Sequence, residues 1–244
     1  MTHNFTKYII LAVSALGLSA LPAAADSQCP TGVALSTYVV SGFTCFIGDL
    51  DFSNFSYTSS ASMPPTPVPD TSVTVATVDN AAGIGFSFNS SWTAAGAGEF
   101  SDAAIGFTVS VIGGGPATLE DAALIQTGAV DNTNSGSLAS VGENGCSGSS
   151  NGLDCSQMWS LVTSQTSNSS ATSAHTFYLP TGSLTVSKDI TAVDGSSANA
   201  FASVSLVQDT FSQVPEPRAL AMLLGLGLIA GLGLKKKLQG VQQS

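Results

Sequence analysis

Charged side chains are scarce in this chain, and the positive ones are almost confined to its two ends. Only 9% of the 244 residues are charged, with 6 basic against 16 acidic side chains. All sixteen acidic residues and a single base, Lys188, lie in the segment 26–217, which therefore has a net charge of −15. A nucleic-acid-binding surface needs clustered basic residues. The sequence therefore predicts no nucleic-acid partner, and its acidity favours solubility outside the cell.

Histidines and metal-ligand spacings are also rare. The chain has two histidines, His3 and His175, and its cysteines lack the short paired spacing of zinc sites. Asp49 and Asp51 are weak candidates for a Ca²⁺ site, because Ca²⁺ needs about six to eight converging oxygens. Asp in turns more often bonds its own backbone. We therefore predict no cofactor and no metal, with Asp49 and Asp51 as the open alternative.

The segment 26–213 lacks the 3.6-residue period of a capped helix and alternates with period two instead. Ile105, Phe107, Val109 and Val111 alternate with small or polar residues, and turn signals such as Asp194-Gly195 separate the apolar runs. This pattern predicts one all-β domain, an antiparallel β-sandwich. A jelly-roll-like arrangement of its strands is one variant of this prediction. Further runs are Val73–Val75, Phe86–Phe88, Leu184–Val186 and Val204–Leu206.

Two stretches are poor in strand signals. Residues 63–69 are rich in proline and predict a long extended loop. Residues 132–151 are rich in Ser, Gly and Asn, and we expect a mobile loop there. Phe52, Phe55 and Tyr57 are expected to anchor the core.

Four cysteines, an even number, fall in the segment that follows the N-terminal apolar run. In an oxidising compartment they predict two disulfides, for which three pairings exist. We favour the two that close short local loops. These are Cys29–Cys45 and Cys146–Cys155.

Catalytic signals are weak. Residues 148–152 match the G-x-S-x-G pattern around Ser150, but the nucleophile elbow requires a strand before it and a helix after it. A flexible disulfide loop is the favoured interpretation. His175 is expected on a strand surface before Phe177, and no spacing supports a Ser–His–Asp arrangement. We predict a protein without enzymatic activity, with a hydrolase using Ser150 and His175 as a remote alternative.

Exposed aromatic side chains on Ser/Thr-rich strands are typical of carbohydrate binding. Trp92, Trp159 and Tyr178 are candidates for stacking on sugar rings. Core packing is the commoner fate of Trp in a sandwich, so sugar binding remains an alternative here.

The N-terminus, residues 1–25, has the three parts of a secretory signal peptide. Lys7 supplies the positive charge, residues 8–18 form an apolar helix, and Ala23 and Ala25 flank a small-x-small cleavage site. Signal peptidase is the implied partner.

The C-terminus, residues 214–237, also has three parts. Val214-Pro215-Glu216-Pro217 precedes an uncharged apolar run over 219–234, which would rise about 24 Å as a helix. Basic flanks can reach the headgroups and make up the remaining thickness. Lys235, Lys236 and Lys237 follow and should stay cytoplasmic, as should the tail 238–244. The run predicts a transmembrane helix.

This tail resembles the PEP-CTERM sorting signal of exported bacterial proteins, a tail also labelled as an ice-binding-protein C-terminal domain. The resemblance rests on Pro215-Glu216-Pro217, the apolar run and the lysine cluster. It implies recognition and cleavage by exosortase, a membrane cysteine protease, and a link to extracellular polysaccharide and biofilm. An ordinary membrane anchor after a proline-rich stalk is the alternative.

The sequence therefore predicts an exported protein that is tethered to the inner membrane until its tail is processed. It then belongs to the cell surface or the extracellular matrix. A structural or adhesive role in the extracellular polymer is the favoured function. A carbohydrate- or calcium-binding module is the alternative.

Overall fold

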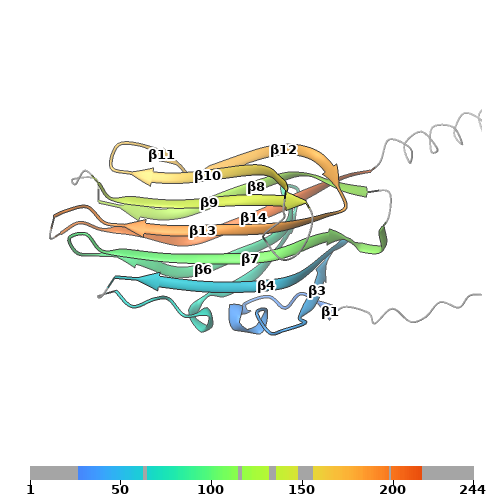
Figure 1. Ribbon diagram of the computed structural model, residues 1–244, viewed down its shortest axis with the longest axis horizontal. Coiled ribbons are helices and arrows are strands. Elements are labelled where there is room, and N and C mark those ends of the chain that lie inside the picture. The colour runs from blue at the N-terminus through green and yellow to red at the C-terminus, as the bar shows by residue number, and fades with distance from the viewer. Residues whose placement is uncertain are drawn as a thin grey trace, which may run out of the picture.

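The described part of the chain consists of two β-sheets packed face to face (Figure 1). The all-β, antiparallel prediction is confirmed. Within the described part no helix is long and apolar enough to cross a membrane, and the predicted helices in 1–25 and 219–234 lie outside it. The computed structural model describes residues 27–62, 65–114, 117–131, 136–147, 156–197 and 199–215.

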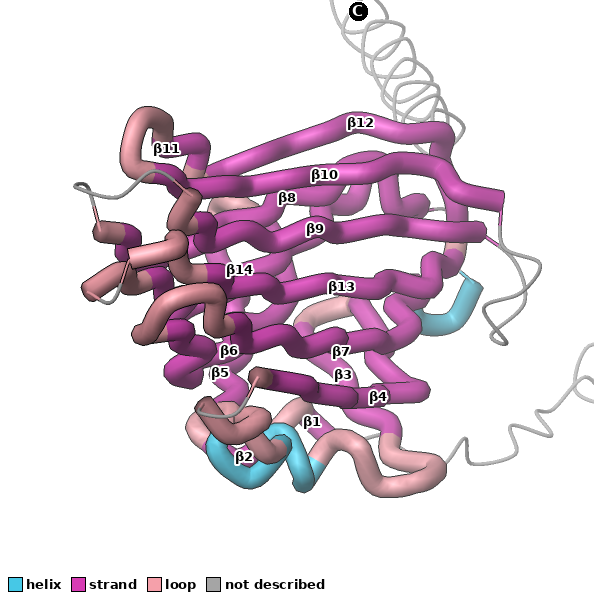
Figure 2. The backbone as a smooth tube through the Cα atoms, turned by 60° about the vertical axis from the view of Figure 1, so that its left-hand side comes forward, coloured by secondary structure: helices cyan, strands magenta, loops and turns pink. Residues whose placement is uncertain are grey.

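The larger sheet has eight strands, and it forms the nearer layer in Figure 2. Its neighbouring strands pair antiparallel, except for β1 and β3, which are parallel. The order across the sheet is β1 (Ser27–Gln28), β3 (Thr44–Ile47), β4 (Leu50–Ala61), β7 (Phe100–Val111), β13 (Ser183–Val193), β9 (Leu138–Ser147), β10 (Ser156–Thr166) and β11 (Ser170–Ala171).

The smaller sheet has six strands, all paired antiparallel. From β6 onward the chain crosses between the sheets at most connections, so residues distant in sequence meet in the core. The order is β12 (Ser173–Thr181), β8 (Ala117–Val130), β14 (Ala202–Pro215), β6 (Gly83–Ala94), β5 (Thr74–Asn80) and β2 (Val33–Ala34). Short 3₁₀ turns are η1 (Leu35–Thr37), η2 (Asp70–Ser72) and η3 (Ile112–Gly114).

One end of the core is a cluster of aromatic rings. Phe86 has five aromatic neighbours, the nearest being Phe52 with a centroid distance of 4.7 Å. Phe52 and Phe55 are buried, as predicted, and Tyr57 is half-buried. The bond Cys29–Cys45 borders this cluster, and that predicted disulfide is confirmed. Cys146 is also disulfide-bonded, while Cys155 lies outside the described residues.

A β-bulge explains how Phe52 and Phe55, three residues apart, both face inward. The pairing of β4 with β7 shifts register between Ser53 and Ser56. Within that bulge Asn54 has a φ of 55°, a left-handed conformation that Asn tolerates better than most residues. The extra residue reverses the alternation, so both rings enter the core.

The expectation of a mobile loop over 132–151 is wrong for much of its length. Strand β9 occupies Leu138–Ser147 and pairs with both β13 and β10. Its glycines misled the sequence interpretation, because one of them has a packing role. A Cβ on Gly145 would lie 2.1 Å from the indole ring of Trp159, so only glycine leaves room for that ring in the core.

The proline-rich stretch forms a loop, as predicted, in its described residues 65–69. The carbonyl oxygen of Val68 accepts hydrogen bonds from Tyr57 Oη at 2.8 Å and from Ser59 Oγ at 2.7 Å. These bonds fasten the loop to strand β4.

Candidate functional site

The most unusual site in the molecule is a cluster of three ionisable side chains that is sealed inside the core. Lys188 Nζ lies 2.5 Å from Asp209 Oδ2 and 3.0 Å from Glu143 Oε2. The side chains of all three residues are 0% exposed. Lys188 and Glu143 belong to strands β13 and β9 of the larger sheet, and Asp209 to strand β14 of the smaller one. The cluster therefore links the two sheets.

Burial changes the protonation of this cluster. Burial raises the pKa of Glu143 to about 8, and the charge of Asp209 adds to the rise. Burial raises the pKa of Asp209 as well, although Lys188 opposes it. Burial lowers the pKa of Lys188, but the two carboxyl groups more than reverse this, and the net direction is upward. At neutral pH the cluster therefore holds a charged Lys188 and a protonated Glu143 beside Asp209.

An aromatic ring closes one side of the cluster. Lys188 Nζ lies 4.5 Å from the ring centroid of Phe107, a cation–π contact that is stronger without water. Phe107 in turn packs edge-on against Phe211 at 6.2 Å. The ammonium group is therefore held between two carboxyl groups and an aromatic face.

Sequence reasoning missed this cluster, although a signal existed for two of its members. Lys188 continues the inward alternation of Leu184 and Val186, and Glu143 lies two residues after buried Val141. A lone base in phase with core residues marks a buried charge that needs a partner.

The inward position of Asp209 could not be predicted from the sequence, because a β-bulge precedes it in strand β14. Val204 and Leu206 were expected to share a face, but β14 shifts register between them. Val204 is buried while Leu206 is only half-buried, and the inward positions continue at Val207 and Asp209. An irregularity of this kind leaves no mark in the hydrophobic pattern.

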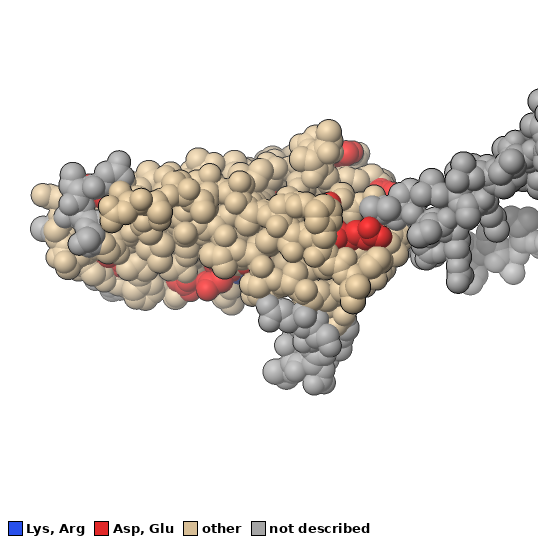
Figure 3. Space-filling model, turned by 90° about the horizontal axis from the view of Figure 1, so that it is seen from above, with Lys and Arg blue, Asp and Glu red and all other residues tan. Residues whose placement is uncertain are grey.

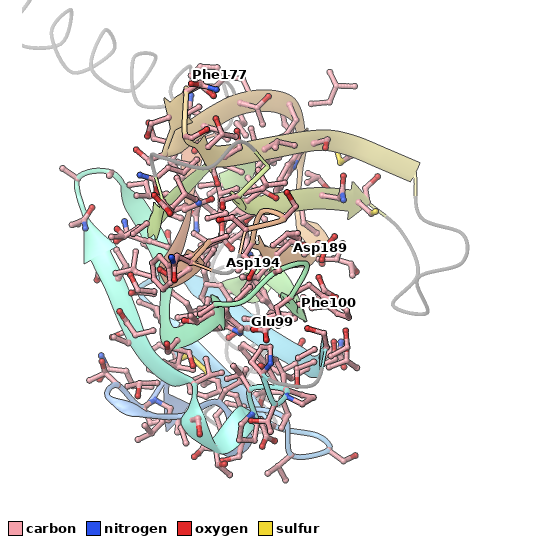
Figure 4. All side chains as sticks on the ribbon, turned by 90° about the vertical axis from the view of Figure 1, so that its left-hand side faces the viewer. Glu99, Phe100, Phe177, Asp189 and Asp194 are labelled. Carbon is pink, nitrogen blue, oxygen red and sulfur yellow. A yellow bond between two sulfur atoms is a disulfide. The ribbon has the colours of Figure 1, made fainter. Side chains whose placement is uncertain are left out.

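Other acidic side chains serve as braces between strands and loops. Asp194, which is 3% exposed, accepts a hydrogen bond from the Glu99 amide at 2.8 Å and another from the Gly96 amide. Figure 4 shows Glu99 and Asp194 near each other, with Phe177 well away from them. Asp102 accepts from Thr191 Oγ1 at 3.0 Å, and burial together with Asp102 raises the pKa of neighbouring Asp189.

His175 lies on the exposed side of β12, as predicted, with its ring 4.7 Å from that of Phe177. Its Nε2 is 3.6 Å from Asp121 Oδ2, and Asp121 accepts hydrogen bonds from the amide and hydroxyl of Ser212. The carboxylate therefore lies between the hydroxyl and the imidazole. In a catalytic triad the imidazole lies between them, so this group does not activate Ser212. Ser150 lies outside the described residues.

The candidate calcium ligands do not converge on a site. Asp49 Oδ1 accepts a hydrogen bond from Gln213 Nε2 at 2.9 Å, which ties the β3–β4 turn to β14. Among the described residues, no three His, Cys, Asp or Glu side chains form a group that could hold a metal ion. Asp51 lies on strand β4 and pairs in register with Ser110 of β7.

Two of the three aromatic candidates for sugar stacking are buried in the core. Trp92 is 0% exposed, and Trp159 is 5% exposed and stacks on Tyr178 at 5.8 Å. Tyr178 is half-buried and donates a hydrogen bond to the Asp121 carbonyl at 3.0 Å. Both tryptophans therefore pack in the core and are not exposed for stacking on sugar rings. The large exposed apolar side chains of strand β12 are instead Phe177 and Leu179, at 75% and 78% exposure.

An open groove of about 390 Å³ lies between the proline-rich loop and the Ser/Thr-rich ends of β6 and β7. Its surface is hydroxyl-rich and carries no charge. Ser90 Oγ donates to the Ser72 carbonyl at 3.1 Å, and Ser91 and Thr93 share a hydrogen bond. The lining residues are Pro65, Thr66, Pro67, Val68, Pro69, Ser72, Ser90, Ser91, Thr93 and Ser101.

The predicted sorting motif begins inside the fold. Strand β14 continues to Pro215, with Val214 and Pro215 paired to Thr118 and Ala117 of β8. The domain therefore extends two residues beyond the expected boundary at 213. The remaining predicted processing residues lie outside the described ranges: Ala23, Ala25, Glu216, Pro217, Lys235, Lys236 and Lys237.

Comparison with known proteins gives no family for this chain. No protein-family model matches it, and no curated protein matches it either. Among solved structures, TmCBM61 in complex with β-1,4-galactotriose has a TM-score of 0.32 and 11% identity, covering 66% of this chain and 88% of its own. The family 11 carbohydrate-binding module from Clostridium thermocellum, in complex with a β-1,3-1,4-mixed-linked tetrasaccharide, has a TM-score of 0.22 and 15% identity, covering 63% and 87%. These TM-scores are too low to carry an argument about this chain.

Proposed function

We propose that the protein is a non-enzymatic structural or adhesive component of the extracellular polymer, delivered to the cell surface by a PEP-CTERM tail. The observation that carries this proposal is the order of the tail. A Pro-Glu-Pro motif at 215–217 precedes the apolar run 219–234 and the lysine cluster 235–237. The motif supplies the protease site, the apolar run arrests the chain in the membrane, and the lysine cluster keeps the end of the tail cytoplasmic. Export itself follows from the signal peptide at 1–25.

The end of strand β14 supports this proposal. Only Glu216, Pro217 and Arg218 separate its last residue from the apolar run. The sandwich would therefore be held directly against the outer face of the inner membrane, without a spacer, until a protease cuts the tail. Proline fixes φ and lacks an N–H, so we expect the two prolines that flank Glu216 to disfavour a helix there, which suits recognition by a protease.

The sandwich itself suits a passive load-bearing role. Its ionisable side chains brace strands and loops internally, as Asp194 and the Lys188 cluster do. Figure 3 shows one face with a few separate acidic side chains on an otherwise uncharged surface. The repeated crossing of the chain between the sheets supports the jelly-roll variant of the fold.

Sorting is tested by expressing the full chain with and without an exosortase-type protease. The Glu216→Ala/Pro217→Ala double variant is compared with Gln242→Ala, which changes the tail outside the motif. With the protease, wild type and Gln242→Ala should leave the membrane fraction without Lys235–Lys237, and the double variant should retain them, as intact mass would show. A wild-type chain that keeps its terminal lysines in the presence of the protease would refute the sorting proposal.

The matrix role needs a separate test in the producing cell. A deletion strain should lose adhesion or matrix mass, and the wild-type gene should restore it. Restoration by the Glu216→Ala/Pro217→Ala variant at the wild-type level would show that release is not required. Unchanged adhesion and matrix mass in the deletion strain would contradict the structural role.

The groove favours a second candidate function, the binding of a neutral carbohydrate. Six of its ten lining residues carry hydroxyl groups and none carries a charge, which suits hydrogen bonding to sugar hydroxyls. Titration of neutral polysaccharides should shift the melting temperature of wild type but not of Ser90→Ala/Ser91→Ala. Ser187→Ala, outside the groove on strand β13, is the matched control. No shift with wild type would remove this candidate.

A further inference from the structure

The Lys188 cluster joins the two sheets at one point, with a primary amine directly against a carboxyl group. The 2.5 Å between Lys188 Nζ and Asp209 Oδ2 is shorter than the roughly 2.7–2.9 Å of a charge-assisted N–H···O bond. Each residue is fixed in the middle of a paired strand, Lys188 opposite Ile105 and Glu143, and Asp209 opposite Phe86 and Leu124. The two reactive groups are therefore held together by the fold itself.

The carboxyl groups of the cluster are poorly satisfied. Among the described residues, Glu143 Oε1 and Asp209 Oδ1 are buried without a hydrogen-bond partner, and Glu143 Oε2 has only its ion-pair contact with Lys188. Leaving such groups buried without partners is unfavourable, because each has lost its hydrogen bonds to water. An ion pair alone therefore does not explain why this arrangement is retained, since apolar residues would fill the same volume at less cost.

We propose that the chain joins Lys188 Nζ to Asp209 Cγ through an amide bond, with Glu143 as the group that transfers protons. The bond is a cross-link between the two sheets, formed after the strands have paired. It needs only the three side chains and no cofactor, oxidant or reductant.

The reaction balances as a condensation. The Lys188 ammonium first passes a proton to the Asp209 carboxylate, which gives an amine and a carboxylic acid. The Nζ lone pair attacks Cγ, the N–C bond forms, and one C–O bond of Asp209 breaks. Glu143 donates its proton to the leaving hydroxyl group and takes one from Nζ, so a single water leaves and Glu143 ends unchanged.

The environment favours each step. The cluster is fully buried against Phe107, and a site without water destabilises the charged reactants while the amide product is neutral. Burial keeps Glu143 protonated at neutral pH, which general acid catalysis requires. Attack is also favoured by proximity, because both groups are prepositioned.

The product would constrain the chain much as a disulfide does. It closes a loop between residues 188 and 209, which are 21 positions apart, and such a closure stabilises by restricting the unfolded state. Unlike a disulfide, an amide survives reduction. This bond would give an exported protein a cross-link independent of redox conditions.

Intact mass of the purified full chain, denatured and fully reduced, decides the proposal. After the termini are fixed by end peptides, the cross-linked protein should weigh one water less than its sequence. Trypsin gives an independent readout, because Lys188 is the only lysine or arginine between Asp26 and Pro217. An acylated lysine is not cleaved, so the digest should hold 26–218 as one species. The full sequence mass together with cleavage after Lys188 would overturn the bond.

Variants test the assigned roles. Glu143→Gln is nearly isosteric but cannot donate an acidic proton, and it should show its full sequence mass and cleavage at Lys188. Asp209→Asn should release ammonia instead of water and be lighter by that amount. Lys188→Met should show no mass loss. A loss of one water in Glu143→Gln at the wild-type rate would overturn the role of Glu143, whereas the bond itself is decided on the wild-type chain, whichever variants fold.

Discussion

One half of the core is built from rings that pack edge-on or tilted around Phe86, and the other from three ionisable groups around Lys188. Phe107 contacts both, at 5.9 Å from Phe86 between centroids and 4.5 Å from Lys188 Nζ. We refer to them as the aromatic half and the charged half. The aromatic half consists of Tyr38, Phe43, Phe52, Phe55, Phe86 and Phe88, and the charged half of Lys188, Glu143 and Asp209.

The two halves should tolerate change differently. Ring packing depends mainly on buried area and volume, so a similar apolar residue preserves most of the stabilisation. The charged half depends on partners, because removing one group leaves the others buried without compensation. Although both halves are buried, substitutions should therefore destabilise the charged half more than the aromatic half. Variants in each half can measure this difference in the free energy of unfolding.

Lys188→Met should have the largest effect. It leaves Glu143 and Asp209 facing each other without a cation, and breaking a buried pair in this way costs about 3–5 kcal/mol. The free energy of unfolding, measured by urea denaturation, should fall by at least that amount, because this variant also cannot form the Lys188–Asp209 amide. The triple variant Lys188→Met/Glu143→Leu/Asp209→Leu should recover part of the loss, because it removes the stranded carboxyl groups. A triple variant less stable than the single one would contradict the comparison.

The pH dependence of stability should distinguish the halves next. The pKa of Glu143 rises from 4.5 to about 8 in the folded protein, so the folded state holds a proton that the unfolded state releases. Its stabilising contribution is complete below pH 4.5 and is lost as pH rises towards 8. The slope is at most about 1.4 kcal/mol per pH unit for one proton. Asp209, with its raised pKa, acts in the same direction in any chain whose Lys188–Asp209 amide has not formed.

Glu143→Gln is the matched control for this pH effect. The difference in unfolding free energy between wild type and Glu143→Gln, measured across the same pH range, should change steadily with pH. Groups outside the Lys188 cluster cancel in that difference. A difference that is constant across this range would show that Glu143 does not hold its proton in the folded state.

The sequence predicted the aromatic half better than the charged half, for physical reasons. Large apolar residues in period two announce a buried face, and Phe86, Phe88 and Phe107 were all placed correctly on strands. In strand β9 the inward positions are Ala139, Val141, Glu143 and Gly145, so its hydrophobic signal was too weak to distinguish from a loop.

The hydrophobic pattern also could not predict which strands pair or in which register. The bulge between Val204 and Leu206 turns Asp209 inward, and glycine at 145 is understood only beside Trp159 from another strand. The tail, in contrast, was interpreted entirely from sequence, because its signals are local and contiguous. That interpretation of the tail stays a prediction. Within the described fold, features that depend on one segment, such as the period-two strands, were predictable, and features that depend on register between segments were not.

Phe86→Leu should have the smallest effect of the three changes. Leucine keeps much of the apolar volume but loses the edge-on contacts with Phe52 at 4.7 Å and Tyr38 at 5.6 Å. The expected loss of unfolding free energy is about 1–2 kcal/mol. Because no ionisable partner is involved, this loss should be equal at acid and alkaline pH. Phe107→Leu also removes part of the apolar cover of the Lys188 cluster, which should lower the raised pKa of Glu143 and make the loss vary with pH. A pH-independent loss in Phe107→Leu would show that Phe107 stabilises only the aromatic half and is not coupled to the charged half.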